Sequence, residues 1–246
     1  MNGIWVTLGR ELRAYFFSPL AYAVLASFLF VNGITFATLI GYLNDAPSAV
    51  GAPMEFFFGG TILFWLALAF VGPILPMRLL SEERRSGSLE ILMTAPVTET
   101  QVVLGKYFAA LAFYLVLWAP TAVYAVIVAR YSDLDWGPVA SAYLGVVGVG
   151  SLFLAVGLFA SGISRNQIVA ALVGFALVFA LFILGLLEFL VNDEGVRQVL
   201  GHVNLIQHME DFAKGIVDTR RLVYYASGTA FFLFLTSRTL LANKWR

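Results

Sequence analysis

The stretch NQIVAALVGFALVFALFILGLL, residues 166–187, holds 22 residues and no charged side chain. About 20 apolar helical residues cross the hydrocarbon core of a bilayer, which is about 30 Å thick. The whole chain has the same character, since 60% of its 246 residues are hydrophobic and 12% are charged, against roughly 25% charged in soluble domains. The composition therefore predicts an all-α, polytopic membrane protein that forms a single transmembrane domain over residues 1–246.

Working outward from this stretch, uncharged runs recur along the chain and predict five clear spans at about residues 20–43, 56–77, 103–129, 136–163 and 166–190. A sixth run is shorter, with 16 residues between Arg221 and Arg238. It reaches span length, at about residues 222–242, if both arginines extend to the membrane interfaces. We therefore expect six transmembrane helices.

Six spans place both termini on the same side of the membrane. Ten of the 15 Lys and Arg residues fall on that side, so the positive-inside rule predicts that both termini are cytoplasmic. Arg10 and Arg13 precede an apolar run, as they would in a signal peptide, but the run is 24 residues long. That length favours an uncleaved first span.

Two amphipathic segments flank the spans. Residues 3–17 place Ile4, Leu8 and Leu12 on one helical face before Ser18-Pro19, which predicts an N-terminal interfacial helix; the alternative is a cytoplasmic extension of the first span. The outer loop at 188–221 carries apolar residues at helical spacing and predicts an outer amphipathic helix, weakened at Gly215; these residues are Leu205, Met209, Phe212, Ala213, Ile216 and Val217.

Several function classes are disfavoured. The chain has no cysteine, no phosphate-binding loop and a net charge of zero, which argues against thiol chemistry, an ATPase site of its own and nucleic-acid binding. An intramembrane hydrolase needs a nucleophile with a base at the same depth. Ser151 and Ser161 lie in the fourth span, whereas His202 and His208 lie in the outer loop. The spacing of the two histidines matches no metal-ligand motif, so neither a catalytic nor a metal site is expected.

The most charged segment is RLLSEERRSGSLEILMTAPV, residues 78–97, in which six of the first 13 residues are charged. Gly87 should break the chain direction, and Leu89, Leu92 and Met93 share one face of a predicted two-turn helix that Pro96 ends. Thr98 and Gln101 predict a capping box, with Val97 packed on Val102, that opens the next span. A plain inner loop needs only a few residues, so this longer segment favours a docking surface.

The same segment resembles the first cytoplasmic loop of type 2 ABC transporter permeases. The resemblance lies in the charged cluster Glu82 to Arg85, Gly87-Ser88, the turn Leu89-Glu90-Ile91-Leu92, Thr94-Ala95-Pro96 and Leu104-Gly105-Lys106. RELRAYFFSPLAY at 10–22 and MEDFAKGIVDTRRLVYYAS at 209–227 resemble the permease subgroup associated with bacterial gliding motility. One departure is Arg221, where that pattern has an acidic residue.

The resemblance implies the membrane-spanning half of an exporter in the bacterial cytoplasmic (inner) membrane. Two permeases, identical or homologous, would pair with two cytoplasmic ATPases that bind ATP and Mg, so this chain would be no enzyme and would hold no cofactor. Its loop at 78–101 would carry a coupling helix that docks on the ATPase. We expect the docking residues to be Glu82, Glu83, Arg84, Arg85, Gly87, Leu89, Glu90, Leu92, Met93 and Pro96.

In such a dimer the second and fifth spans would face the central pathway. The expected lining residues are Phe64, Leu68, Gly72, Gly174, Leu177, Leu181 and Gly185. Membrane lipids are the other expected partner, and no nucleic acid is expected. An alternative function is a membrane scaffold that binds the ATPase without moving a substrate, and a third is an intramembrane enzyme.

Overall fold

The computed structural model describes residues 2–45, 53–87, 98–191 and 193–244, and every regular element in these ranges is a helix. The all-α prediction is confirmed for this part of the chain. In chain order the helices are α1 (Asn2–Phe16), α2 (Pro19–Asp45), α3 (Pro53–Phe57), α4 (Ile62–Ile74), α5 (Met77–Ser86), α7 (Glu99–Trp118), η1 (Ala119–Thr121), α8 (Ala122–Tyr131), α9 (Trp136–Ile163), α10 (Gln167–Leu186), η2 (Leu187–Phe189), α11 (Glu194–Gly201), α12 (Leu205–Ala213) and α13 (Thr219–Lys244).

Within the described ranges, five helical stretches are long and apolar enough to cross a membrane: Pro19–Asn44, Ile62–Ser86, Glu99–Tyr131, Trp136–Ile163 and Gln167–Leu186. The chain is therefore a multi-pass membrane protein. The predicted spans at 20–43 and 136–163 agree closely with these stretches. The predicted sixth span at 222–242 forms a 26-residue helix, α13, but its arginines, tyrosines and hydroxyl residues keep it outside the apolar group. Five spans are shown, and the count of six stays a prediction.

The second predicted span, at 56–77, is wrong in its limits. The chain turns through Phe58–Thr61, with Gly59 at a φ of 97°, and α4 begins only at Ile62. At the other end the helix pauses at Leu75 and Pro76 and continues as α5 through the charged residues to Ser86. These charged turns stay helical because Leu79, Leu80 and Ser81 on the same helix are buried. In the third span, Pro120 lies in the 3-10 turn η1 between α7 and α8, so the α-helix is interrupted there.

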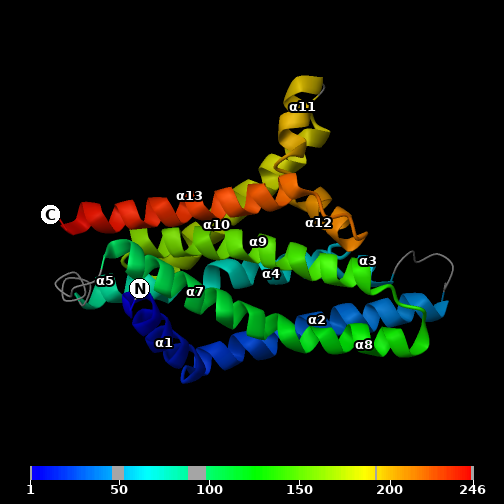
Figure 1. Cartoon of the computed structure of the whole chain (residues 1–246), viewed down its shortest axis with the longest axis horizontal. Helices are drawn as coiled ribbons and strands as arrows, with labels where there is room; N and C mark the ends of the chain where they lie inside the picture. Colours follow the sequence, from blue (N-terminus) through cyan, green and yellow to red (C-terminus); the bar gives the residue numbers. More distant parts are fainter. Residues whose placement is uncertain (1, 46–52, 88–97, 192, 245–246) are drawn as a thin grey trace.

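Helix α9 is the centre of the bundle, and α4, α5, α10, α12 and α13 pack around it (Figure 1). Its small residues allow close approach: a Cβ added at Gly150 would lie 2.2 Å from Tyr114 Cζ, and one at Gly157 would lie 2.6 Å from Pro76 Cγ. Small residues in spans let helices come together within one chain. The fourth span is thus packed on nearly all sides.

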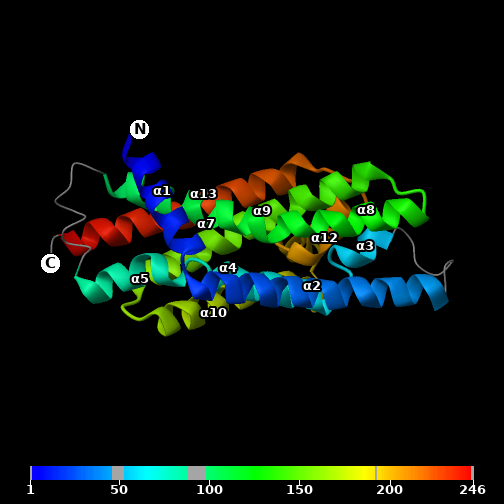
Figure 2. The same ribbon diagram turned by 90° about the horizontal axis from the view of Figure 1, so that it is seen from below.

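Helix α1 crosses the bundle beside α7 and α5, at the end where the two termini lie (Figure 2). The face predicted to be apolar, with Ile4, Leu8 and Leu12, is only partly buried. The buried positions are Thr7, Glu11 and Tyr15. The side of α1 that packs most deeply against protein is therefore centred beside the predicted face, and Thr7 meets Gly105 of α7 so closely that a Cβ added at Gly105 would lie 2.7 Å from Thr7 Cβ. The interfacial position of α1 stays a prediction.

The outer loop at 188–221 contains two helices, α11 and α12, where one was predicted. The apolar face of α12 is buried as predicted at Leu205, Met209 and Phe212, and Phe212 packs on Gly145 of α9. Ile216 and Val217 are exposed, because the helix ends at Ala213 and Gly215 turns the chain with a φ of 86°.

Both ends of the chain lie at one end of the bundle, together with α5 (Figures 1 and 2). We refer to this as the terminal end. The other end, where α3, α12 and the tip of α8 lie, is the distal end. The two described helices that flank the predicted docking segment meet there, since α5 ends and α7 begins at the terminal end.

Candidate functional site

Four charged residues predicted for the docking surface lie on the last turns of α5: Glu82, Glu83, Arg84 and Arg85. The helix ends at Gly87, whose φ of 70° is the left-handed conformation that glycine supplies at helix C-termini. The helix therefore ends at the glycine where a change of chain direction was predicted. Glu82 and Arg85 are exposed, whereas Glu83 and Arg84 are partly buried, so only part of the predicted charged rim faces solvent.

The predicted apolar anchor lies outside the described residues, which resume at Thr98. This applies to Leu89, Glu90, Leu92, Met93 and Pro96, and to the packing of Val97 on Val102. The start of α7 is described and carries the predicted capping box. Thr98 Oγ1 accepts a hydrogen bond from Gln101 N at 3.3 Å, and Gln101 Oε1 accepts one from Thr98 N at 3.2 Å.

The charged side chains of α1, α5 and α7 meet in what we define as the Lys106 cluster, made of Arg10, Glu11, Glu83 and Lys106. Lys106 Nζ donates to Glu11 Oε1 and to Glu83 Oε1, each at 2.8 Å. Arg10 donates to the same two oxygens at 2.7 Å and 2.9 Å. The side chain of Lys106 is 1% exposed. One buried lysine thus ties together three helices from distant parts of the sequence.

The Lys106 cluster balances two cations with two carboxylates. Burial raises the pKa of the Glu11 carboxyl, but Lys106 and Arg10 outweigh burial and hold that pKa below its ordinary value. Burial likewise lowers the pKa of Arg10, but Glu11 and Glu83 outweigh it and raise the pKa. Glu11 and Arg10 are therefore ionised at neutral pH. A buried charge that loses its partner destabilises a protein by about 3–5 kcal/mol, so the cluster fixes α1, α5 and α7 relative to one another.

The break between α4 and α5 is held by α1. Leu79 N bonds to Pro76 O, which leaves the carbonyl of Leu75 free of its usual helical donor. The hydroxyl of Tyr15 donates to that carbonyl at 2.6 Å. Arg78 lies 4.9 Å from the centre of the Tyr15 ring and donates to Ser18 Oγ at 3.0 Å. The kink is thus a fixed feature of the terminal end.

Helix α9 holds the other side of α5 through Ser161. Its hydroxyl oxygen accepts from Leu80 N at 3.1 Å and Ser81 N at 3.0 Å, and the hydroxyl donates to Met77 O at 2.8 Å. The hydroxyl thus donates its one proton and accepts two hydrogen bonds, which is its full capacity. Ser161, considered above as a possible nucleophile, is in this structure a side-chain cap for the first turn of α5.

The remaining groups of a possible hydrolase do not meet Ser161. Ser151 Oγ donates to Gly148 O at 2.7 Å within α9. His208 Nδ1 lies 3.2 Å from the hydroxyl of Tyr225, and His202 Nδ1 donates to Gln198 O at 2.6 Å. The serine and histidine side chains that were considered together are therefore committed to different partners.

The residues predicted to line a pathway lie on α4 and α10, where both helices face α9. Phe64 and Leu68 are buried, a Cβ at Gly72 would lie 2.5 Å from Phe153 Cβ, and one at Gly174 would lie 3.0 Å from Pro73 Cβ. Gly185 packs on Asn204 in the same way, and Leu177 and Leu181 are partly buried. Five of the seven residues are thus buried within this chain and two are partly buried, and their role in a pathway stays a prediction. The exposed faces of the two helices carry other residues: Ile62, Leu66 and Phe70 on α4, and Ile168, Leu172 and Phe179 on α10.

Sequence reasoning missed the partners of Glu83. Lys106 is the only charged residue of α7 apart from Glu99 at its start, and a lysine inside a span needs a nearby carboxylate. That signal was present, but the identity of its partners was not, because Glu11 and Glu83 lie 95 and 23 residues away.

Comparison with known protein families gives one result. A family model described as ABC-2 family transporter protein matches residues 40–209, which is 170 of the 246 residues. The matched region begins near the end of α2, includes Lys106, α9 and α10, and ends in α12. No curated protein matches the chain.

Proposed function

Because the chain belongs to the ABC-2 family of transporter proteins, we propose that it is the membrane-spanning permease of an ATP-binding-cassette exporter, driven by a separate cytoplasmic ATPase. The family assigns it a transport role as a permease subunit without an ATPase site of its own. The finer parts of the proposal are the docking segment, the assembly with a second permease copy or homologue, and the binding of ATP and Mg by the partner ATPase.

The observation that carries the docking proposal is the position of the Lys106 cluster. Glu83 lies one turn before Gly87, where the chain leaves α5 for the predicted docking segment, and Lys106 lies two turns after Thr98, where the chain returns in α7. The two are joined at 2.8 Å. Both flanks of the segment are therefore held to one rigid base, so a force on the segment is passed to the bundle.

The route of that force follows the contacts of α5. Glu83 connects it to α7 and α1, Ser161 connects it to α9, and Arg78 connects it to α1 through the carbonyl of Ala14. Since α9 packs against most of the other helices, a movement of α5 reaches the whole bundle. This arrangement favours a subunit that converts nucleotide-driven motion of a partner into helix motion.

The topology proposal is that α13 is the sixth span and that both termini are cytoplasmic, in a bacterial inner membrane. At 1.5 Å per residue its 26 residues extend about 39 Å, enough for a bilayer core. It runs beside α9 and returns the chain to the terminal end (Figure 1). Since the chain contains no cysteine, single cysteines at residues 2 and 245 can be treated with a membrane-impermeant thiol reagent before and after the spheroplasts are lysed. Labelling before lysis would contradict the orientation.

The pathway proposal is that α4 and α10 of two permeases face one another, with the exposed residues of these helices at the dimer contact. Leu172→Cys and Phe70→Cys should cross-link two chains in native membranes. Val123→Cys on α8, which is also exposed, is the matched control and should not. Cross-linking through Val123 but not through the other two would place the dimer contact elsewhere.

The docking proposal is tested by co-purification from native membranes. Leu92→Asp should remove the ATPase from the purified complex, because a charge in an apolar anchor opposes burial. Val199→Asp makes the same change on an exposed site of α11 at the other end of the molecule and should retain the ATPase. Stoichiometric ATPase with Leu92→Asp would count against docking at this segment.

The scaffold function differs in one outcome, since a scaffold binds the ATPase but moves nothing. Flux of labelled amphiphiles in liposomes that contain the purified complex should depend on ATP if the chain is an exporter. ATPase binding without any such flux, over a panel of amphiphiles, would favour the scaffold.

Placement in the gliding-motility subgroup rests on the resemblance of residues 10–22 and 209–227 alone.

A further inference from the structure

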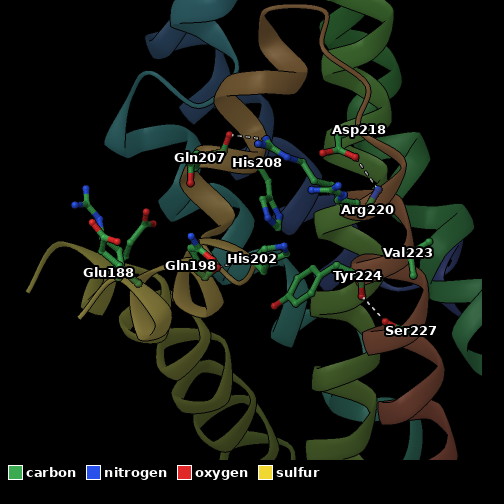
Figure 3. Close-up of a pocket in the computed structure, with 14 residues that line it drawn as sticks. Glu188, Gln198, His202, Gln207, His208, Asp218, Arg220, Val223, Tyr224 and Ser227 are labelled. Carbon is green, nitrogen blue, oxygen red and sulfur yellow. Dashed lines mark hydrogen bonds between the residues drawn. The ribbon is translucent and has the colours of Figure 1, made fainter. Parts of the chain in front are cut away.

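The distal end contains a pocket of about 860 Å³ between α11, α12 and the first turns of α13 (Figure 3). This volume falls in the range of small-molecule sites, about 300–1,000 Å³. Both histidines of the chain line it, together with Tyr224. No step of the proposed coupling between ATPase and bundle uses this pocket.

One wall of the pocket is α11, which is a two-faced helix. Its polar side, with Glu194, Arg197 and His202, lines the pocket. Its other side carries Val196 and Val199, which are 49% and 66% exposed, and no residue of α11 is buried. The helix projects sideways from the bundle (Figure 1). In a membrane protein an amphipathic helix of this kind lies in the interface with its apolar side in lipid, so the pocket opens at the boundary of the bilayer.

The two walls carry opposite net charges. The wall formed by η2 and α11 holds Glu188, Glu194 and Arg197, which sum to −1. The wall formed by the start of α13 holds Asp218, Arg220 and Arg221, which sum to +1. In Figure 3, Glu188 and Arg220 lie on opposite sides, with the rings of His202, His208 and Tyr224 between them.

Part of this charge is free to bind a ligand. Arg221 is engaged, because it pairs with Asp211 and donates to Gln207 O at 2.8 Å, and Glu188 accepts from Asn204 at 2.9 Å. In contrast, the side chains of Arg220, Glu194 and Arg197 have no hydrogen-bond or ion-pair partner among the described residues. A cation on one wall and a carboxylate on the other therefore lack partners across an open pocket.

His208 lies between the two walls and adds no charge to the pocket at neutral pH. Burial, and then the nearby charge of Arg221, lower the pKa of His208 to about 4, and its Nδ1 lies 3.2 Å from the hydroxyl of Tyr225. Within the described ranges no three His, Asp or Glu side chains are placed to hold a metal ion. The pocket thus favours a ligand with both charge signs over a cation alone.

We propose that this pocket binds the headgroup of a zwitterionic phospholipid from the adjoining leaflet. The phosphate lies against Arg220, the ammonium group lies against the α11 wall at Glu194, and Tyr224 forms the surface between them. Val223, which is exposed and lines the pocket, faces the glycerol end of the lipid, and the acyl chains follow the apolar side of α11. An anionic lipid would place its only charge against one wall and leave the carboxylates of the other unmatched.

The proposal is tested on the full chain purified in detergent, by native mass spectrometry with phosphatidylethanolamine and phosphatidylglycerol. Wild type should retain phosphatidylethanolamine preferentially. Arg220→Glu and Glu194→Arg each give the two walls the same sign and should weaken its binding by about tenfold, as expected for losing one charged hydrogen bond. Arg130→Glu, at an exposed arginine at the distal end of α8, is the matched control and should change binding less than about twofold.

Because neither the Arg220 nor the Glu194 side chain has a partner among the described residues, both variants should keep the wild-type thermal midpoint, so their binding can be compared directly. Equal retention of phosphatidylethanolamine by all four proteins would overturn the proposal, as would equal retention of the two lipids by wild type. Displacement of the lipid by soluble phosphoethanolamine at the same concentration would also overturn it, since the pocket would then recognise a free metabolite. The test involves no ATPase, so its failure leaves the proposed transport function intact.

Discussion

The terminal and distal ends of the molecule use the same charged side chains in opposite ways. In the Lys106 cluster, each of the two cations lies 2.7–2.9 Å from each of the two carboxylates, and Lys106 is 1% exposed. In the distal pocket, Arg220 and Glu194 are exposed and face an open space. Burial explains the difference, because a charge out of water must be paired, whereas a charge in water needs no partner. The first end is suited to transmit force and the second to receive a ligand.

Breaking the Lys106 cluster should give the largest effect. Lys106→Met leaves the carboxylates of Glu11 and Glu83 beside each other without their buried cation, at an expected cost of about 3–5 kcal/mol. The thermal midpoint in detergent should fall sharply, and adding Glu11→Gln should restore part of it. Arg197→Met, the equivalent change at the distal end, should leave the midpoint near wild type. A Lys106→Met protein as stable as wild type would mean that the cluster does not hold the terminal end.

Acidification should lower the stability of the protein through His208 at the distal end. The unfolded chain takes up a proton near pH 6.5 but the folded chain only near pH 4, so the unfolded state gains protons between these values and stability falls as the pH falls. The total effect is about 3 kcal/mol. Thermal midpoints at pH 7 and pH 4.5 should differ less in His208→Gln than in wild type, whereas His202→Gln, at an exposed histidine, should keep the wild-type difference. The same pH dependence in all three proteins would contradict this origin.

A smaller loss is expected at the contact between α9 and α5. Ser161→Ala removes the acceptor of Leu80 N and Ser81 N in a buried place, which should cost about 2 kcal/mol. Ser151→Ala, on the same helix, removes a hydroxyl whose main bond is to its own helix and should cost less than about 0.5 kcal/mol. Chemical denaturation in detergent can compare the two, and equal losses would show that the bonds of Ser161 to α5 add nothing.

The smallest effect should come from the free charges of the distal pocket. Glu194→Gln removes a carboxylate that has no partner in the described structure, so stability should change by less than about 0.5 kcal/mol. A loss comparable to that of Lys106→Met would remove the contrast between the two ends.

The sequence predicted best where one local property decides the structure. The fourth span was predicted over 136–163 and is observed over Trp136–Ile163, because a long uncharged run begins after the capping residue Asp135 and ends before Arg165. The capping box at Thr98 and the turn at Gly87 were predicted for the same reason. Each depends on residues within one or two turns of chain.

The sequence failed where distant residues decide. The charged residues of α5 were expected to end a span, yet the helix continues through them, and Glu83 pairs with Lys106 and Arg10. No local pattern marked Glu11 as a buried residue, yet the same cluster buries it. Ser161 gave no local sign that it would cap a helix 80 residues away. These contacts depend on helix packing, which the hydrophobic pattern of each segment does not encode.

The Lys106 cluster also has a consequence for the order in which the chain is assembled. All four of its residues belong to the first 106 positions of the sequence, so the ribosome has delivered every member before it begins α9. Lys106 would be costly to leave alone in the membrane, and it meets its carboxylates without waiting for the second half of the protein. The N-terminal half can therefore close on itself during synthesis and offer α9 a finished surface, on which Ser161 makes the last connection.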